Sequence, residues 1–253
     1  MLKNIFRKKL KNQQIPQDTL AMAGEYAVLT EKPSKKKKII IAITCVALAV
    51  LMAFGVFIFS LYNVKKEYEY VASFTSLPAP VQIETSNTFT KIVDDYTVTF
   101  DVKASYTLTG LVVEKYYYYP HKIANKLARY DLGMVWGPLL AEDLKEQMTF
   151  KNTGTRFLRY SYKNSLVQKL GSKEAVTDSL SNNHMIHADE RVLKLIRNVK
   201  EGDYIKIEGY LVNISYTNGY ERGTWPTSLS RSDHGDGACE VIYVTNITWL
   251  KLQ

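Results

Sequence analysis

The sequence contains little cysteine, since 253 residues include only Cys45 and Cys239. Cys45 lies inside a long apolar run and Cys239 lies near the C-terminus, so we do not expect these two thiols to form a disulfide. A domain held together by several disulfides is therefore excluded. The residues after the apolar run must fold around a hydrophobic core of their own, and roughly 190 residues are enough for one.

Charge is absent from residues 39–62, the 24-residue run IIIAITCVALAVLMAFGVFIFSLY. An α-helix crosses the ~30 Å hydrocarbon core of a bilayer in roughly 20 residues, so this run predicts a membrane span. A core helix of a soluble protein normally keeps a polar face, which this run lacks. Because 38 residues precede the run, we expect an uncleaved signal anchor and not a cleaved signal peptide.

The orientation of the span follows from the lysines beside it. Lys35 to Lys38 directly precede the apolar run, whereas Lys65 and Lys66 on the other flank are followed by Glu67 and Glu69. The positive-inside rule therefore places the N-terminal tail in the cytoplasm. The expected parts are a cytoplasmic basic tail, a transmembrane helix, a stalk and an external domain, at residues 1–38, 39–62, 63–80 and 81–253.

A basic excess is also absent from the large domain. Residues 1–38 hold ten Lys or Arg and three acidic residues, which accounts for +7 of the chain's net charge of +8. Nucleic-acid-binding domains carry a basic surface of their own, so we expect no nucleic-acid partner. Leu2, Ile5, Phe6 and Leu10 alternate with the basic residues at helical spacing, which predicts an amphipathic helix on the lipid bilayer or, alternatively, a charge run that only sets topology.

The external domain is predicted to be α+β with a mainly antiparallel sheet. Residues 96–103, 106–119, 202–216 and 239–252 have strand-like patterns, and Asn218-Gly219 predicts a hairpin turn. Residues 172–180 and 189–199 have helical patterns, and the polar SNNHMIH segment lies between them. We expect three or four short helices and a sheet that can curl into a barrel-like form.

The segment SLSRSDHGDGACE, Ser228 to Glu240, is rich in side chains used in catalysis and metal binding. Its serines and aspartates also favour side-chain bonds to the backbone that hold turns. We therefore expect an ordered polar loop between two strands, which can bind a ligand or a partner chain. The residues assigned to this structural or ligand-binding role are Asn183, Ser228, Ser230, Arg231, Asp233, Asp236 and Glu240.

Two chemical alternatives remain for this region. Cys239 is a buried small side chain or a nucleophile that needs a base, for which His184 is the candidate, with Asp189 or Asp236 as the third group. His184, His187 and Asp236 form an alternative metal site, since His-x-x-His spacing suits zinc. No paired Cys-x-x-Cys motif is present, and the sequence specifies no cofactor.

Several sequence blocks resemble a family of uncharacterised bacterial membrane-anchored proteins with no assigned activity. The blocks are WG (136–137), SNNHMI (181–186), GDYIKIEGYL (202–211), TSLSRSDHGDGACE (227–240) and IYVT (242–245). The resemblance implies a bacterial inner-membrane protein with a periplasmic domain. Residues 181–207 also have a faint similarity to the motif region of L,D-transpeptidases, but the position of that family's nucleophilic cysteine is not Cys here, so we do not assign the activity.

The sequence therefore predicts a single-pass inner-membrane protein whose periplasmic domain binds a protein or envelope ligand within a membrane-associated assembly. The alternative is an envelope hydrolase or transferase that uses Cys239 and His184, or a metal held by His184, His187 and Asp236. Because no specific catalytic signature is present, the interpretation favours binding over catalysis.

Overall fold

The computed structural model describes residues 34–230, 232 and 238–253. The predicted amphipathic helix of the tail and three loop residues, Arg231, Asp233 and Asp236, lie outside these described residues. The chain divides into two compact units, residues 1–59 and 60–253, and each is considered by itself.

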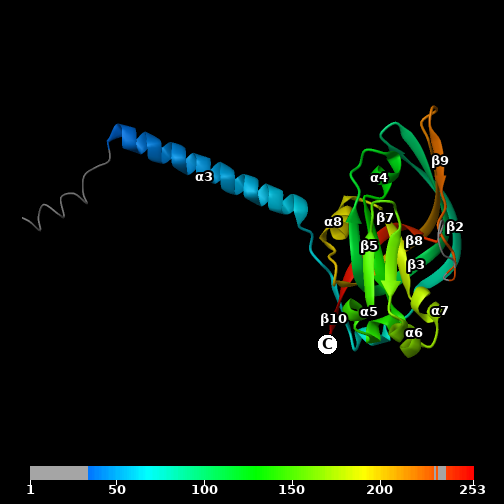
Figure 1. The fold of residues 1–253 in the computed structure, drawn as a ribbon. Helices are drawn as coiled ribbons and strands as arrows, with labels where there is room; N and C mark the ends of the chain where they lie inside the picture. Colours follow the sequence, from blue (N-terminus) through cyan, green and yellow to red (C-terminus); the bar gives the residue numbers. More distant parts are fainter. Residues whose placement is uncertain (1–33, 231, 233–237) are drawn as a thin grey trace, which may run out of the picture. The chain divides into compact units, whose positions relative to one another are not determined.

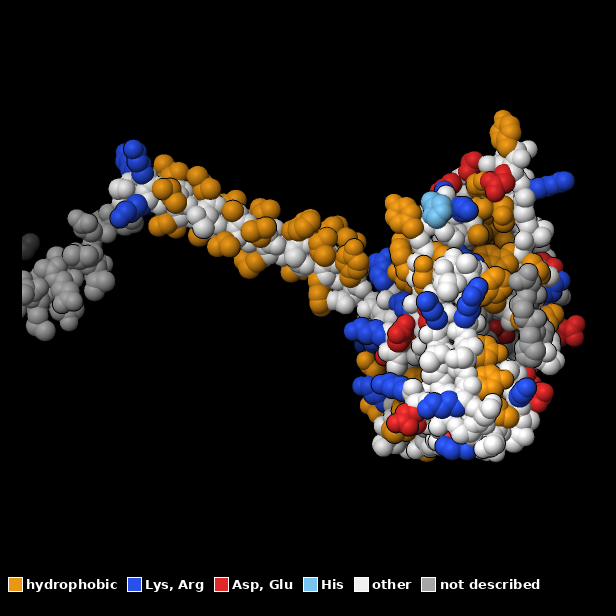
Figure 2. Space-filling view, viewed as in Figure 1, with side chains coloured by type: hydrophobic (Ala, Val, Ile, Leu, Met, Phe, Trp, Pro, Cys, Tyr) orange, Lys and Arg blue, Asp and Glu red, His pale blue; other side chains and the backbone are white. Residues whose placement is uncertain are grey.

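The first unit is dominated by α3 (Lys35–Tyr62), a helix of 28 residues with none of them buried. Its mean hydropathy reaches 2.9, and hydrophobic side chains cover its visible face (Figure 2). This length and composition allow α3 to cross a membrane, and a signal sequence near an N-terminus has the same character. The Thr44 hydroxyl donates to the Ile40 carbonyl at 2.9 Å, so this polar group is bonded within the helix.

The second unit is built on an eight-stranded sheet (Figure 1). Its strands are β1 (Tyr68–Val71), β2 (Val81–Val93), β3 (Tyr96–Tyr117), β4 (Tyr130–Val135), β7 (Leu180–His187), β8 (Tyr204–Thr217), β9 (Arg222–Trp225) and β10 (Glu240–Leu252). The strand order is β1-β10-β7-β4-β3-β8-β9, β2 also pairs with β3, and β10 pairs with β8 as well as with β7. The pairings therefore form a closed circuit through β10, β7, β4, β3 and β8. Only β1–β10 and β10–β7 are parallel among the described pairs, which confirms the mainly antiparallel sheet.

Shorter elements surround this sheet. They are the two-stranded sheet of β5 (Met148–Asn152) and β6 (Leu158–Tyr162), the helices α4 (Ile123–Leu127), α5 (Leu144–Gln147), α6 (Asn164–Leu170), α7 (Lys173–Thr177) and α8 (Glu190–Asn198), and the 3-10 turns η1 (Phe74–Ser76) and η2 (Gly137–Ala141). The described part of the domain thus has five short α-helices where three or four were expected. The α+β class is confirmed.

The longest strand, β3, joins two segments that the sequence presents as separate strands. Its buried and partly exposed positions alternate almost without interruption over 22 residues, as a half-buried strand requires. Register shifts near Lys103 and Val113 bend it. At Gly110 an added Cβ would lie 2.3 Å from the Val135 carbonyl oxygen, and at Gly209 it would lie 2.3 Å from that of Tyr243. Glycine at these points lets neighbouring strands approach closely where the sheet bends.

Helix α8 packs its apolar face on the core, as its pattern predicts. Val192, Leu195 and Ile196 belong to a buried cluster with residues of β3, β4, β8 and β10. Asp189 caps the helix by accepting the Val192 amide at 2.8 Å, and this cap offsets one of the unbonded donors of the first turn. The helix is therefore fixed directly after β7, the strand that carries both candidate histidines.

Two segments differ from their sequence-based description. The SNNHMIH segment, to which the sequence pattern assigns no secondary structure, forms most of β7 and pairs with β4 and β10. The expected stalk at 63–80 contains β1, which pairs with β10, so part of that segment belongs to the sheet.

Candidate functional site

Strand β7 brings His184 against a carboxylate that the sequence did not indicate. Asp131 of β4 lies directly opposite His184 in the ladder, and His184 Nδ1 is 2.9 Å from Asp131 Oδ1. Both side chains are almost completely buried. Burial alone would raise the pKa of Asp131, but His184 and Arg156 hold that pKa below its usual value. The carboxylate is therefore ionised and orients the imidazole.

Arg156 completes this group, which we call the His184 cluster (Asp131, Arg156 and His184). Its Nη1 donates to Asp131 Oδ1 at 2.9 Å, and its guanidinium lies 3.6 Å from the ring centroid of Tyr118. The His184 and Trp225 rings are 4.7 Å apart. Arg156 has a φ of 67°, a left-handed conformation that costs energy for a non-glycine residue. Aromatic contacts and the buried carboxylate together hold it there.

Cys239 lies beside this cluster. Its Sγ is 3.6 Å from Asn182 Nδ2 and 3.7 Å from the Arg156 carbonyl oxygen. The register pairs Glu240 with Asn183, which places Cys239 next to Asn182. Since side chains two residues apart share a face of a strand, Asn182 and His184 point to the same side. The thiol, an imidazole and a carboxylate are thus gathered in one region.

The described part of the 228–240 loop is held by its own serines. Ser228 Oγ donates to the Ser230 carbonyl at 3.0 Å and accepts the Ser230 amide at 3.0 Å. Ser230 and Ser232 hydroxyls are 3.1 Å apart. These contacts are the turn-forming bonds expected of Ser228 and Ser230. Glu240 is buried at the start of β10.

Asn183, the remaining residue of the predicted set, has a structural role. It is fully buried, and its Nδ2 donates to the Leu132 carbonyl at 2.9 Å. It also accepts the Ser181 hydroxyl at 3.1 Å. These bonds tie β7 to β4 and leave its side chain away from solvent.

The two candidate metal-binding histidines do not converge. They are three residues apart on one strand, so alternation places His184 and His187 on opposite faces of β7. His184 is committed to Asp131. No group of three His, Cys, Asp or Glu with metal-site geometry occurs in the part of the chain that the structure describes. The third proposed ligand, Asp236, lies outside that part.

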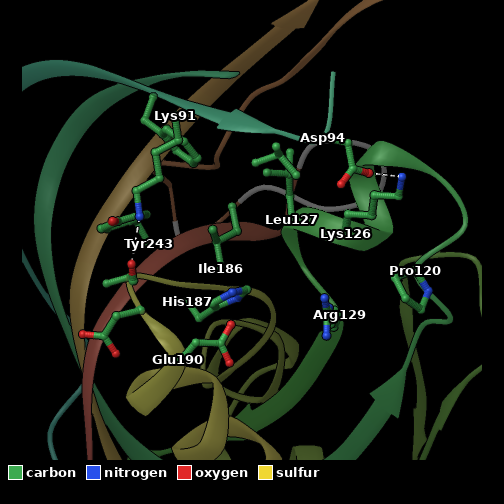
Figure 3. Close-up of a pocket in the computed structure, with 14 residues that line it drawn as sticks. Lys91, Asp94, Pro120, Lys126, Leu127, Arg129, Ile186, His187, Glu190 and Tyr243 are labelled. Atoms are coloured by element: carbon green, nitrogen blue, oxygen red, sulfur yellow. Dashed lines mark hydrogen bonds and ion pairs between the residues drawn. The ribbon is translucent and has the colours of Figure 1, made fainter. Parts of the chain in front are cut away.

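His187 instead lines a pocket of about 440 Å³ at one end of the sheet (Figure 3). The pocket is formed by β2, β3, β7 and β10 together with α4 and the start of α8. Phe100, Leu127 and Ile186 give it a buried apolar floor. Its volume falls in the usual range for small-ligand sites, roughly 300–1,000 Å³.

Charged groups of both signs surround the pocket, and some are already paired. Lys126 forms an ion pair with Asp94. Lys91 donates to the Ala188 carbonyl at 2.8 Å and lies over the Tyr243 ring, 4.9 Å from its centroid. These three interactions build the rim and leave Arg129, His187 and Glu190 as the groups available to a ligand.

Two polar atoms of the pocket residues are buried without a partner. Arg129 Nε and His187 Nδ1 have no hydrogen-bond partner among the described residues. Burial lowers the pKa of His187, with further lowering by Arg129 and Lys91 and opposition from Glu190, so its imidazole is neutral. Figure 3 shows the Glu190 carboxylate next to the His187 ring, with Arg129 to one side of both. Buried polar atoms are normally bonded, and a ligand in the pocket would supply partners.

Sequence reasoning found His184, His187 and Cys239 but not the residues that define their surroundings. Asp131 offered a weak signal, as a single carboxylate inside the apolar segment YDLGMV. Arg129 and Arg156 offered none, because their positions depend on strand pairing across distant parts of the chain.

Comparisons with protein-family models, with curated proteins and with solved structures find no match to this chain. The predicted relation to uncharacterised bacterial membrane-anchored proteins stays a prediction.

Proposed function

We propose that this chain is a single-pass protein of the bacterial inner membrane whose periplasmic domain binds a protein or envelope ligand within a membrane-associated assembly. In this proposal α3 is a signal anchor with the N-terminus in the cytoplasm. The closed circuit of strand pairings supports a barrel-like form for the sheet, with the pocket at one of its ends.

The pocket beside His187 carries the proposal. An apolar floor with a few convergent polar groups is the usual construction of a ligand site. Here the floor is Phe100, Leu127 and Ile186, and two buried polar atoms nearby have no partner among the described residues.

Photo-crosslinking in intact membranes tests this function. A photoreactive amino acid replaces Lys126 at the pocket rim in one full-length chain and the exposed Arg159 of β6 in a control chain. We expect an adduct of defined mass from position 126 that position 159 does not give. Adducts of equal yield at both positions, or none at either, contradict binding at the pocket.

A thiol-dependent envelope hydrolase or transferase is the second candidate. It is favoured by the hydrogen bond of 2.9 Å between His184 and Asp131 in the region of Cys239. A base held by a carboxylate is the arrangement that activates a thiol nucleophile. The expected reaction is attack of the Cys239 thiolate on an acyl carbon, with His184 taking the thiol proton and returning it to the leaving group.

Alkylation rates separate this candidate from an inert thiol. In a Cys45→Ser chain only Cys239 remains to react with iodoacetamide. An activated Cys239 should be alkylated at pH 6.5 nearly as fast as when it is fully ionised. A thiol of ordinary pKa near 8.5 is alkylated roughly a hundredfold more slowly at pH 6.5 than when it is fully ionised. If the alkylation rate of Cys239 follows the pH dependence of an ordinary thiol and does not change in His184→Gln, the proposal of a thiol-dependent enzyme is wrong.

A further inference from the structure

Two charged side chains of the pocket, Glu190 and Arg129, make no ion pair with another described residue. Lys126 is paired with Asp94, and Lys91 is bonded to the Ala188 carbonyl. Glu190, in the first turn of α8, and Asp189, its cap, form one wall. Arg129 forms another, to one side of both His187 and Glu190 in Figure 3. Glu190 and Asp189 raise the pKa of His187, and Arg129 lowers it. All three charged groups therefore lie close to the same imidazole.

The acidic wall remains negative despite the helix behind it. A helix N-terminus contributes roughly half a positive charge, whereas Asp189 and Glu190 carry two negative charges. The Asp189 carboxylate already accepts a hydrogen bond from the Val192 amide. Glu190 is exposed and makes no ion pair with another described residue, so its carboxylate is available to a cation.

The basic wall is available to an anion. Arg129 is partly exposed, and the structure gives its side chain no ion pair within the described residues, while its buried Nε has no hydrogen-bond partner there. Lys126 and Lys91 are engaged elsewhere. Arginine binds carboxylates with two parallel bonds, and the neutral His187 imidazole can donate one more.

We propose that the pocket binds a zwitterionic ligand of short-peptide size, with its carboxylate on Arg129, its ammonium on Glu190 and an apolar side chain on the floor. This inference rests on the proposed binding function and names the chemical class of the ligand. The combination of opposite charges around a floor of Phe100, Leu127 and Ile186 disfavours a ligand with one charge, because it would leave one wall without a counter-charge.

Three forms of one dipeptide test the assignment with the full-length protein in lipid nanodiscs. The probes are leucyl-leucine, its N-acetyl form and its C-terminal amide, and calorimetry measures their affinities. We expect the free dipeptide to bind roughly tenfold or more tightly than either modified form, since each modification removes one charge-assisted contact.

Matched variants assign each charge to its wall. Arg129→Gln is expected to remove the difference between the acid and the amide, and Glu190→Gln the difference between the free amine and the acetylated form. Arg159→Gln and Glu84→Gln change exposed residues outside the pocket and should leave all three affinities unchanged. Thermal unfolding of each variant checks that it is folded.

The outcomes distinguish this inference from the function beneath it. If the three forms bind with equal affinity, or if none of them binds, the proposal of a zwitterionic ligand is wrong. If an adduct still forms specifically at position 126, the binding function stands and only the ligand class is wrong. If that adduct is also absent, both proposals fail.

Discussion

The residues of the His184 cluster show how buried charge is tolerated in this domain. Asp131 has no exposed surface, and Arg156 and His184 both contact its Oδ1 at 2.9 Å. Removing one member of such a group leaves its partners buried without a counter-charge, which costs more than the intact group contributes.

Asp131→Asn is therefore expected to lower the free energy of unfolding by about 3–5 kcal/mol. Asp101→Asn is the matched control, because Asp101 pairs with Lys103 at the surface with both side chains substantially exposed, and its loss should cost less than about 1 kcal/mol. Urea unfolding of the two variants gives the comparison. Equal effects would show that the cluster contributes no more than a surface pair.

Glu114 of β3 is expected to make stability depend on pH. Burial, with help from Glu201 and Asp131, raises its pKa from 4.5 to about 7. The folded state then binds more protons than the unfolded state between pH 4.5 and 7, so stability falls as pH rises through this window. At pH 8 Glu114→Gln should stabilise the protein by about 1–2 kcal/mol, allowing for screening by solvent.

The same variant supplies its own reference at low pH. Near pH 4 both the folded and unfolded states protonate Glu114, so wild type and Glu114→Gln should differ little in thermal unfolding. A gain from Glu114→Gln that is as large at pH 4 as at pH 8 would mean that packing and not ionisation is responsible.

At the scale of elements, Lys115 links β3 to the end of α8. Its Nζ donates to the carbonyls of Ile196, Arg197 and Val199 at 2.7–2.9 Å. The last carbonyls of a helix have no partner within the helix, so a cation there stabilises it. Burial lowers the pKa of Lys115 to about 8, which shows that this bonding is made at a desolvation cost.

Lys115→Met should destabilise the domain by about 1–3 kcal/mol and speed hydrogen exchange most strongly in α8. Lys145→Met, at an exposed position of α5, should do neither. Exchange that rises uniformly along the domain would contradict a local role in holding α8. The position of Glu190 at the pocket depends on the same helix.

The elements with strong periodicity were predictable, and β7 was not. Alternation in β3 and the apolar stripe of α8 follow from burial on one face, which the sequence records directly. In contrast, β7 is buried on both faces and still carries Asn182, Asn183 and His184. Their bonds to Arg156, Leu132 and Asp131 make this possible, and such partners cannot be seen in a linear sequence. The candidate histidines were found by residue type, whereas the pocket required the pairing of distant strands.

At the scale of the whole molecule, composition separates the parts. The uncharged run, residues 39–62, forms most of α3, which has no buried residue, and the basic excess of the chain precedes this run. The second unit, residues 60–253, has its own buried clusters. In our proposal this division anchors a ligand-binding domain at the membrane surface, and the pocket beside His187 is where the ligand is held.

Plugging the pocket tests this account most directly. Ala188 lines the pocket, and Ala188→Phe should fill part of its volume. In a chain that carries the photoreactive residue at position 126, we expect the specific adduct to fall to background in Ala188→Phe while thermal unfolding stays cooperative. An adduct of undiminished yield from the plugged and folded protein would contradict ligand binding in the pocket.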